Sequence, residues 1–315
     1  MKAARFHQHG APEVLQIDDV ETPAPGAGEV RLRVAASAFN PADNGIRAGF
    51  LPIPVTLPHT PGYDVSGTVD ALGEGVDGLT VGDAVIGFLP MTAPGAAAEF
   101  VVAPAEALVA APTSIALEDA AAIPSVALTA WQALFDEAGL AAGQRILITG
   151  AGGTVGGFAV QFAKRAGAHV IATASPRSAA SVRAAGADEV IDHTASSVLE
   201  SVEALDAPVD VLLNLAPFEA DEFTALVGRV RDGGVVVSTT AWMPAPDDEA
   251  RNVRSVVVYV RSDAAQLAEI ASLVDSGAVR VEVARRVTLS GLAAVHAEAT
   301  AGTLRGKVVV LPTVD

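Results

Sequence analysis

From residue 144 onwards, short apolar runs alternate with amphipathic segments. The runs are continuous in aliphatic residues, as strands buried in a parallel sheet need to be. Between them, apolar residues recur at helical spacing, as Val155, Phe158, Ala159 and Phe162 do. We expect strands at 145–149, 169–173, 189–191, 209–213, 233–238 and 255–260, and helices near 154–166, 177–185, 196–204, 219–229 and 263–275. This alternation predicts an α/β fold with a doubly wound parallel sheet of the Rossmann type.

The first 120 residues have a different pattern. Residues 30–35 alternate apolar and charged side chains, and residues 65–72 and 84–89 are further strand candidates. Glycine and proline interrupt these runs, which predicts a barrel-like or partly open β domain. Residues 116–138 then change to an alanine-rich helical pattern.

The tail returns to mixed structure, with a strand at 279–287, a helix at 290–300 and a strand at 307–311. A tail of this kind is expected to pair back onto the first domain. We therefore predict a β-rich domain at 1–120 that is completed by 279–315, and a Rossmann domain at 121–278.

The turn after residues 145–149 is rich in glycine, at positions 150, 152, 153, 156 and 157. Glycine allows a tight turn and lets a pyrophosphate approach backbone N–H groups, while the following helix adds unpaired donors and a positive dipole end. The G-x-G-x-x-G spacing is not met, because the third position is Val155. The alternative is a turn that serves tight helix–strand packing without a ligand.

The residues after the second strand of this unit bear on the choice of cofactor. An acidic side chain there would accept a hydrogen bond from the ribose 2′-hydroxyl of NAD. This chain has Ala174, Ser175, Pro176 and Arg177 instead. A hydroxyl and a guanidinium suit a 2′-phosphate, so the sequence favours NADPH over NADH. Ser175 is also a candidate cap for the next helix, with Pro176 at its first position.

Composition and charge exclude several classes of function. The formal net charge is −17 over 315 residues, which argues against nucleic acid or an anionic membrane as a partner. There is no long apolar run or signal-peptide core, so we expect a soluble, cytoplasmic protein. There is no cysteine, and none of the six histidines are paired at i, i+4, so a metal site is not expected.

Several short motifs occur in a specific order along nearly the whole chain. They are Ala38-Phe39-Asn40-Pro41-Ala42-Asp43, Pro61-Gly62-Tyr63-Asp64-Val65-Ser66-Gly67, Val81-Gly82-Asp83-Ala84-Val85, Leu128-Thr129-Ala130-Trp131, the glycines from Gly150 to Gly156, Gly186-Ala187-Asp188-Glu189-Val190-Ile191-Asp192 and Gly306-Lys307-Val308-Val309. Together they make the chain resemble the medium-chain dehydrogenase/reductase superfamily, and most of all its zinc-free quinone oxidoreductase branch.

The resemblance implies a GroES-like β-rich domain, a Rossmann domain, NADPH in the cleft between them and a homodimer. Zinc-dependent relatives carry a cysteine near position 40 and a Gly-His-Glu segment, where this chain has Asn40 and Gly62-Tyr63-Asp64. Both the catalytic and the structural zinc are therefore expected to be missing.

The resemblance also suggests catalytic residues. Asn40 is expected near the nicotinamide and the substrate carbonyl, with Asp43 in support and Tyr63 contributing its hydroxyl. Each has a structural alternative: Asn40 as the cap of the turn before Pro41, Asp43 as a helix cap, and Tyr63 as packing inside the β domain.

Cofactor contacts are expected on both domains. Thr129 is placed by the nicotinamide or its ribose, His193 by the adenine phosphate and Lys307 near the cofactor cleft. Each of the three has a structural alternative. Thr129 is also a candidate helix residue bonded to its own backbone, His193 a loop residue and Lys307 a solvated strand end. The full set is Thr129, Gly150, Ala151, Gly152, Gly153, Thr154, Val155, Gly156, Ser175, Arg177, His193, Asn214, Leu215 and Lys307.

The expected activity is NADPH-dependent reduction of quinones or conjugated enones by hydride transfer. Phe50 stands where many relatives have a tyrosine, in some as the proton donor, and phenylalanine cannot donate a proton. A tailoring reductase for one conjugated intermediate of a biosynthetic pathway and a non-catalytic NADPH-binding protein remain alternatives.

Overall fold

The computed structural model describes residues 1–205, 207–240, 243, 245 and 247–314. The chain divides into two compact units. Unit 1 consists of Met1–Ser125 and Ser262–Asp315, and unit 2 consists of Val126–Arg261.

Unit 2 is built around a six-stranded sheet in the order β10-β9-β8-β11-β12-β13, and all of its paired strands are parallel. The strands are β8 (Arg145–Thr149), β9 (His169–Ala174), β10 (Glu189–Asp192), β11 (Val209–Asn214), β12 (Val230–Ser238) and β13 (Arg254–Val257). The strand order reverses direction between β8 and β11, which is where Rossmann sheets bind their ligands. The predicted doubly wound parallel sheet is confirmed.

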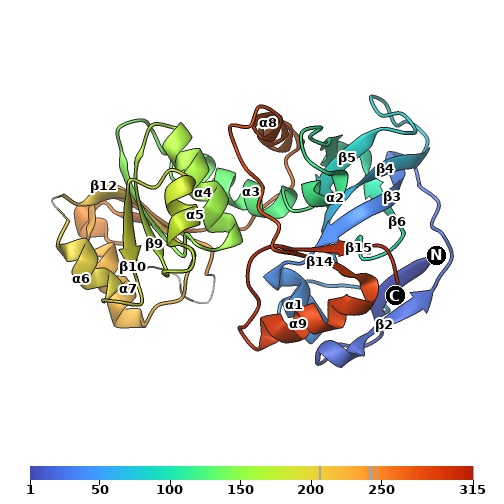
Figure 1. Cartoon of the computed structure of the whole chain (residues 1–315), viewed down its shortest axis with the longest axis horizontal. Coiled ribbons are helices and arrows are strands. Elements are labelled where there is room, and N and C mark those ends of the chain that lie inside the picture. The colour runs from blue at the N-terminus through green and yellow to red at the C-terminus, as the bar shows by residue number, and fades with distance from the viewer. Residues whose placement is uncertain (206, 241–242, 244, 246, 315) are drawn as a thin grey trace. The chain divides into compact units, whose positions relative to one another are not determined.

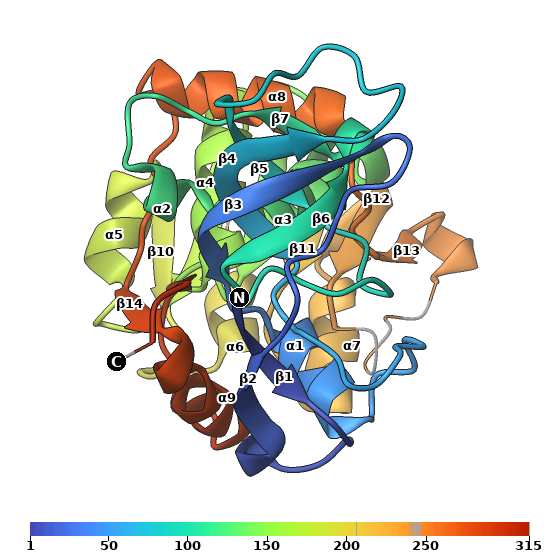
Figure 2. The ribbon, with the colours of Figure 1, turned by 90° about the vertical axis from the view of Figure 1, so that its right-hand side faces the viewer.

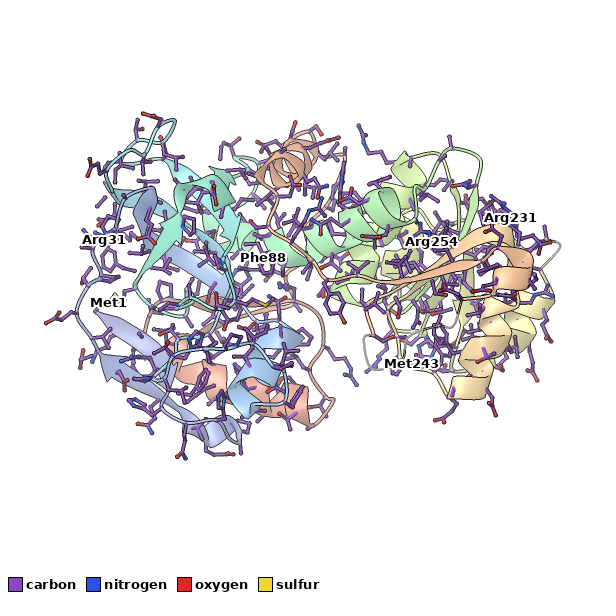
Figure 3. The ribbon with its side chains drawn as sticks, turned by 180° about the vertical axis from the view of Figure 1, so that it is seen from behind. Met1, Arg31, Phe88, Arg231, Met243 and Arg254 are labelled. Atoms are coloured by element: carbon purple, nitrogen blue, oxygen red, sulfur yellow. The ribbon has the colours of Figure 1, made fainter. Side chains whose placement is uncertain are left out.

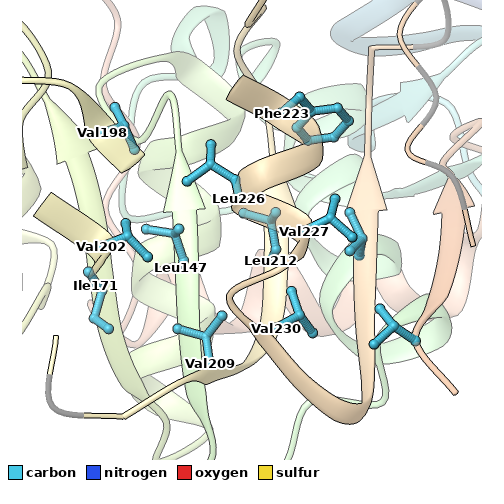
Figure 4. Close-up of a cluster of buried hydrophobic side chains, with 12 residues drawn as sticks. Leu147, Ile171, Val198, Val202, Val209, Leu212, Phe223, Leu226, Val227 and Val230 are labelled. Atoms are coloured by element: carbon cyan, nitrogen blue, oxygen red, sulfur yellow. The ribbon is translucent and has the colours of Figure 1, made fainter. Parts of the chain in front are cut away.

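Helices cover both faces of this sheet (Figure 1). They are α4 (Thr154–Arg165), α5 (Ala179–Ala184), α6 (Val198–Glu203) and α7 (Ala220–Val227). On the face beneath α6 and α7, aliphatic side chains from the strands and both helices form one buried cluster, shown in Figure 4. The unit also holds α3 (Pro124–Trp131, which begins in unit 1), a π-helical turn (Gln132–Glu137) and a 3-10 turn (Glu249–Arg251).

Unit 1 contains a seven-stranded sheet in the order β14-β15-β3-β4-β5-β7, with β6 paired to β3. Its strands are β3 (Glu29–Ala38), β4 (Asp64–Leu72), β5 (Ala84–Phe88), β6 (Phe100–Pro104), β7 (Leu108–Ala110), β14 (Arg285–Thr288) and β15 (Val308–Leu311). Because β15 pairs antiparallel with β3, the predicted return of the tail onto the first domain is confirmed (Figure 1).

Smaller elements complete unit 1. β1 (Lys2–Phe6) and β2 (Leu15–Asp19) form an antiparallel pair, visible at the front of Figure 2. The helices are α1 (Pro41–Ala48), α2 (Leu117–Ala120), α8 (Ala264–Asp275) and α9 (Leu292–Thr300), with 3-10 turns at Pro12–Val14, Ala105–Ala107 and Leu289–Gly291. At the outer surface, Arg31 pairs with Asp70 and lies beside the Phe100 ring (Figure 3).

The largest differences between the sequence-based boundaries and the structure lie in the tail of the chain. The predicted strand at 279–287 is a strand only over Arg285–Thr288. The predicted start of the returning tail at 279 is late, because unit 1 already takes in α8. There the Asp275 carboxylate accepts hydrogen bonds from the backbone N–H groups of Thr113 and Ser114, and these bonds tie α8 to the segment after β7.

No helix in the described ranges is long and apolar enough to cross a membrane.

Two adjacent glycines in α4 test how tightly this helix packs on the turn that precedes it. A methyl group at Gly156 would lie 2.5 Å from Ala151 Cα and 2.6 Å from the Gly150 carbonyl oxygen, whereas one at Gly157 would meet nothing within 4 Å. Gly156→Ala should therefore lower the free energy of unfolding by about 1–3 kcal/mol, through backbone displacement. Gly157→Ala should raise it by about 0.5–1 kcal/mol, since alanine loses less backbone entropy in a helix.

Urea unfolding of both variants beside the wild type measures this contrast. Equal effects of the two substitutions would contradict the close packing at Gly156.

Candidate functional site

The glycine-rich turn of unit 2 connects β8 to α4 and needs its glycines for steric reasons. Gly150 has φ +67°, and a Cβ there would lie 3.0 Å from the Leu215 carbonyl oxygen. A Cβ at Gly152 would overlap the Ser178 hydroxyl. Gly152 and Gly153 are exposed, while Ala151 is buried. The turn thus presents bare backbone at the carboxyl end of β8.

The start of α4 fits a phosphate group. Its N-cap is Gly153, and no side chain caps the helix. The first N–H groups of a helix have no partner within the helix, and the dipole there is positive. Thr154 and Val155, the first residues of the helix, are half-buried. Backbone donors at the end of a glycine turn can bind a pyrophosphate without any charged side chain.

The segment after β9 lies beside this turn. The Ser178 hydroxyl accepts a hydrogen bond from the Ser175 backbone N–H and lies 3.4 Å from the Ser175 hydroxyl. The N-cap of α5 is Ser178, so the suggested capping role of Ser175 is wrong. Arg177 is exposed and has no ion-pair or hydrogen-bond partner among the described residues. His193 is exposed too, and its backbone N–H donates to the Ala174 carbonyl.

Asn214 is the last residue of β11, where a cofactor contact is expected, and its side-chain amide bonds to neighbouring side chains. Its side chain is fully buried. Its Oδ1 accepts from the Thr149 hydroxyl at 2.7 Å, and its Nδ2 donates to the hydroxyls of Ser238 and Thr240. The amide therefore links the carboxyl ends of β8, β11 and β12. Leu215 contributes its backbone N–H, which donates to the Thr149 hydroxyl.

Thr129 lies in α3 of unit 2 and is half-buried.

In unit 1, Asn40 lies two residues after the end of β3 and is the N-cap of α1. The Asp43 carboxylate accepts the Asn40 backbone N–H at 2.8 Å and the Gly62 backbone N–H at 2.7 Å. Asp43 is 1% exposed, so burial raises the pKa of its carboxyl to about 7 against the opposing effect of these two hydrogen bonds. The nearby charge of Asp64 raises the pKa as well. Asp43 thereby joins α1 to the segment before β4.

A buried ion pair lies next to Asn40. Lys307 Nζ donates to Asp64 Oδ2 at 3.0 Å and to Asn40 Oδ1 at 2.6 Å. Asn40 Nδ2 donates to the same Asp64 oxygen at 2.9 Å. Ser125 donates to Asp64 through both its backbone N–H and its hydroxyl, each at 2.7 Å. Lys307 and Asp64 are 3% and 0% exposed. Lys307 is therefore not a solvated strand end; its ammonium orients the Asn40 amide.

The orientation of Asn40 limits what its amide can do. An ammonium only donates hydrogen bonds, so the atom facing Lys307 must be the amide oxygen. One N–H is committed to Asp64, and the other makes a long contact of 3.5 Å with the Ala38 carbonyl. The group that Asn40 can offer to a ligand is this weakly held N–H donor.

The positions at which zinc-dependent relatives carry ligands do not fit a metal ion here. Asn40 and Asp64 converge on the Lys307 ammonium, so a cation already occupies the centre of that set. Within the described part of the chain, no three histidine, aspartate or glutamate side chains are grouped so that they could hold a metal.

Tyr63 is 1% exposed, and its hydroxyl lies 2.8 Å from His59 Nε2 in the interior of unit 1. Burial raises the pKa of the Tyr63 phenol and lowers that of His59 to about 4. This pairing assigns Tyr63 to packing rather than to proton transfer. His59 itself is buried, although the sequence places it between prolines.

Sequence reasoning missed Asp64, Ser125 and Ser178 as members of these sites. Asp64 had a signal, since it occupies the last position of the segment that holds a ligand in zinc-dependent relatives. Ser125 and Ser178 had none, because their contacts depend on how distant segments pack.

The Lys307–Asp64 pair can be tested by removing one charge and then both. Asp64→Asn leaves a buried ammonium without its counter-charge and should lower the free energy of unfolding by about 3–5 kcal/mol. Asp64→Asn combined with Lys307→Met should recover part of this loss. Urea unfolding of the two single variants, Asp64→Asn and Lys307→Met, and of the double variant gives the coupling energy between the two side chains. Additive losses would contradict the ion pair.

Asp43 gives the stability a predictable pH dependence. Its pKa is about 7 in the folded protein against an ordinary value of 3.8, so the unfolded chain releases this proton at lower pH than the folded chain does. Between those values the unfolded state binds fewer protons, and stability falls as pH rises. In this pH range the free energy of unfolding of the wild type should fall by up to about 1.4 kcal/mol per pH unit relative to that of Asp43→Asn. Unfolding across this range measures the difference, and parallel curves would refute the raised pKa.

Comparisons with known proteins agree with this architecture. An alcohol dehydrogenase GroES-like domain model matches residues 26–113, and a zinc-binding dehydrogenase model matches residues 185–310. A chloroplast envelope quinone oxidoreductase homolog of Arabidopsis thaliana is 31% identical over 326 residues, covering 99% of this chain and 98% of that protein. The quinone oxidoreductase of Rattus norvegicus is 35% identical over 219 residues, covering 68% and 66%.

Solved structures give the same result. The structure of an NAD-dependent alcohol dehydrogenase matches with a TM-score of 0.90 at 30% identity, covering 99% of both chains. The quinone oxidoreductase from Coxiella burnetii matches with a TM-score of 0.89 at 30% identity, again over 99% of both chains. The chain belongs to the medium-chain dehydrogenase/reductase superfamily, whose oxidoreductases bind a nicotinamide cofactor.

Proposed function

We propose that this chain is an NADPH-dependent, zinc-independent oxidoreductase that reduces quinones or conjugated enones. The observation that carries the cofactor choice is the composition of the segment after β9. It has no acidic side chain for a ribose 2′-hydroxyl, and it presents Arg177 without a carboxylate partner among the described residues. The quinone oxidoreductases among the similar proteins support the substrate class.

Different residues of unit 2 bind different parts of the cofactor. The pyrophosphate binds at the turn from Gly150 to Gly156, through the backbone N–H groups of Thr154, Val155 and Gly156, which have no acceptor among the described residues. The N–H groups of Ala151 and Gly153 already donate to the carbonyls of Thr173 and Gly150 and hold the shape of the turn. Arg177 binds the 2′-phosphate, with Ser175 beside it and His193 near the adenine end. Thr129 and the segment from Asn214 to Leu215 follow the nicotinamide half. Asn214 acts there through the strands that it links, because its own side-chain atoms are already bonded.

A nicotinamide cofactor held by these residues would supply the hydride for an electrophilic carbon of the conjugated carbonyl compound, and water or the substrate would supply the proton. In unit 1 the Asn40 N–H donates to the carbonyl oxygen, where negative charge develops during hydride addition. Lys307 and Asp64 hold this amide in one orientation, and Asp43 holds the backbone of Asn40. Phe50, which is 73% exposed, contributes no proton.

The activity is tested with a panel of quinones and enones, by following the loss of NADPH absorbance with time. We expect turnover of at least one quinone, with a higher kcat/KM for NADPH than for NADH. Tight NADPH binding without turnover of any panel member would instead support a single specialised substrate or a non-catalytic role.

The cofactor preference is tested by Arg177→Ala. Losing a guanidinium–phosphate contact should weaken NADPH binding about tenfold or more and leave NADH binding nearly unchanged, because NADH has no 2′-phosphate. Arg183→Ala is the matched control, since it removes an exposed arginine from the next turn of the same segment. Isothermal titration calorimetry with both cofactors measures the dissociation constants. Equal losses of affinity for NADPH and NADH would contradict the assignment of Arg177 to the 2′-phosphate.

We also infer that the chain forms a homodimer through the edge of the unit 2 sheet. β13 is the last strand in the sheet order and pairs, among the described residues, with β12 alone. Tyr259, just beyond β13, is 78% exposed. An unpaired strand edge with an exposed aromatic side chain suits pairing with a second copy. Light scattering of the purified protein tests this stoichiometry.

A further inference from the structure

Unit 1 contains a small internal cavity that is separate from the Asn40 amide. It is lined by Ser37, Ala38, Phe39, Asp43, Pro61, Gly62, Ala97, Leu292, His296 and Val310. Most of this lining is apolar, but two of its polar atoms, Ser37 Oγ and His296 Nε2, are buried and have no hydrogen-bond partner in the described structure. A buried polar atom without a partner costs about 1–3 kcal/mol, so two of them around one cavity indicate a bound molecule.

The hydrogen bond from Arg47 fixes what His296 can offer to this cavity. Arg47 Nε lies 3.3 Å from His296 Nδ1, and a guanidinium only donates, so Nδ1 is the acceptor. Burial and the nearby Arg47 charge lower the pKa of His296 to about 3, which keeps the ring neutral. The single ring proton must then be on Nε2. His296 therefore presents a buried N–H donor that lacks an acceptor.

Ser37 contributes a hydroxyl to the lining of the same cavity. It lies on β3 and is 1% exposed. Gly62 leaves the space beside it open, because a Cβ there would lie 3.1 Å from Ser37 Oγ and 3.1 Å from the Ala97 backbone nitrogen. A hydroxyl both donates and accepts, so Ser37 can bond a molecule of either polarity.

Size and charge limit what the cavity holds. Its volume has room for a molecule of about the size of water. Asp43, which also lines it, disfavours an anion when it is ionised, and the fixed N–H donor of His296 disfavours a cation. We propose that the cavity holds one buried water molecule, which accepts a hydrogen bond from His296 Nε2–H and donates one to Ser37 Oγ.

This water joins α9 to β3 close to the catalytic residue Asn40. His296 is on α9 and its ring packs edge-on against Phe39, with 4.8 Å between ring centroids. Phe39 directly precedes Asn40, and Ser37 lies three positions before it. The water is thus a structural bridge that fixes the end of β3 against the last helix of the chain.

The wild-type protein gives the direct test, in a high-resolution crystal structure and by ¹⁵N NMR of the histidine ring. We expect a single water density about 2.8–3.0 Å from both atoms and the Nε2–H tautomer of His296. An empty cavity, the Nδ1–H tautomer, or an anomalous signal from a chloride ion would each overturn the proposal.

Two serine variants then separate this water from a general effect of losing a buried hydroxyl. Ser37→Ala removes the proposed acceptor, whereas Ser66→Ala removes another fully buried, unpartnered hydroxyl that does not line the cavity. Ser37→Ala should weaken or abolish the water density and shift the His296 Nε2 resonance. Ser66→Ala should leave both as they are in the wild type. Identical water density and shifts in the two variants would overturn the bridge.

Discussion

The ion pair between Lys307 and Asp64 constrains much of unit 1. Moving an ammonium and a carboxylate into a protein interior costs several kcal/mol per ion, so each must find its partner with good geometry. These two residues lie 243 positions apart in the sequence. They meet because β15 begins at Val308, pairs with β3, and brings the preceding lysine to the first residue of β4. The tail is therefore an integral part of the unit.

The same pair shapes the candidate site. The Asn40 amide bridges both charges, with its oxygen on Lys307 and its nitrogen on Asp64, and this arrangement allows only one orientation. In zinc-dependent relatives a metal ion provides the positive charge near the reacting carbonyl. Here the positive charge beside Asn40 is the Lys307 ammonium, which is buried and bonded to the amide oxygen. In the function that we propose, hydrogen-bond donation from the Asn40 amide polarises the substrate carbonyl in place of a metal ion.

The sequence predicted most of unit 2, because each of its strands and helices has its own periodicity. The centres of the runs at 145–149 and 209–213, which are residues 146–148 and 211–213, are apolar on both faces, as a strand covered on both sides of a sheet needs to be. Residues 279–284 show where this reasoning fails. They alternate between valine and charged or small residues as a strand would, and Val281 and Val283 do pack against buried alanines. In the described structure these residues do not belong to a strand of either sheet. The alternation of apolar and polar residues shows that one face of the segment is buried, but it does not show that the backbone pairs with another strand.

Site residues were harder to predict than elements, because burial decides their chemistry and burial is a tertiary property. Asn214 and Lys307 have residue types that suit a cofactor contact, yet the polar atoms of both side chains already bond to residues that are distant in sequence. Ser175 also has a partner in Ser178, so its hydroxyl has less capacity left for a phosphate. Arg177 is the polar side chain in this segment that has no hydrogen-bond or ion-pair partner among the described residues. Since a glycine turn can bind the pyrophosphate of either cofactor, the NADPH preference that we propose rests on that guanidinium and on the absence of an acidic side chain directly after β9.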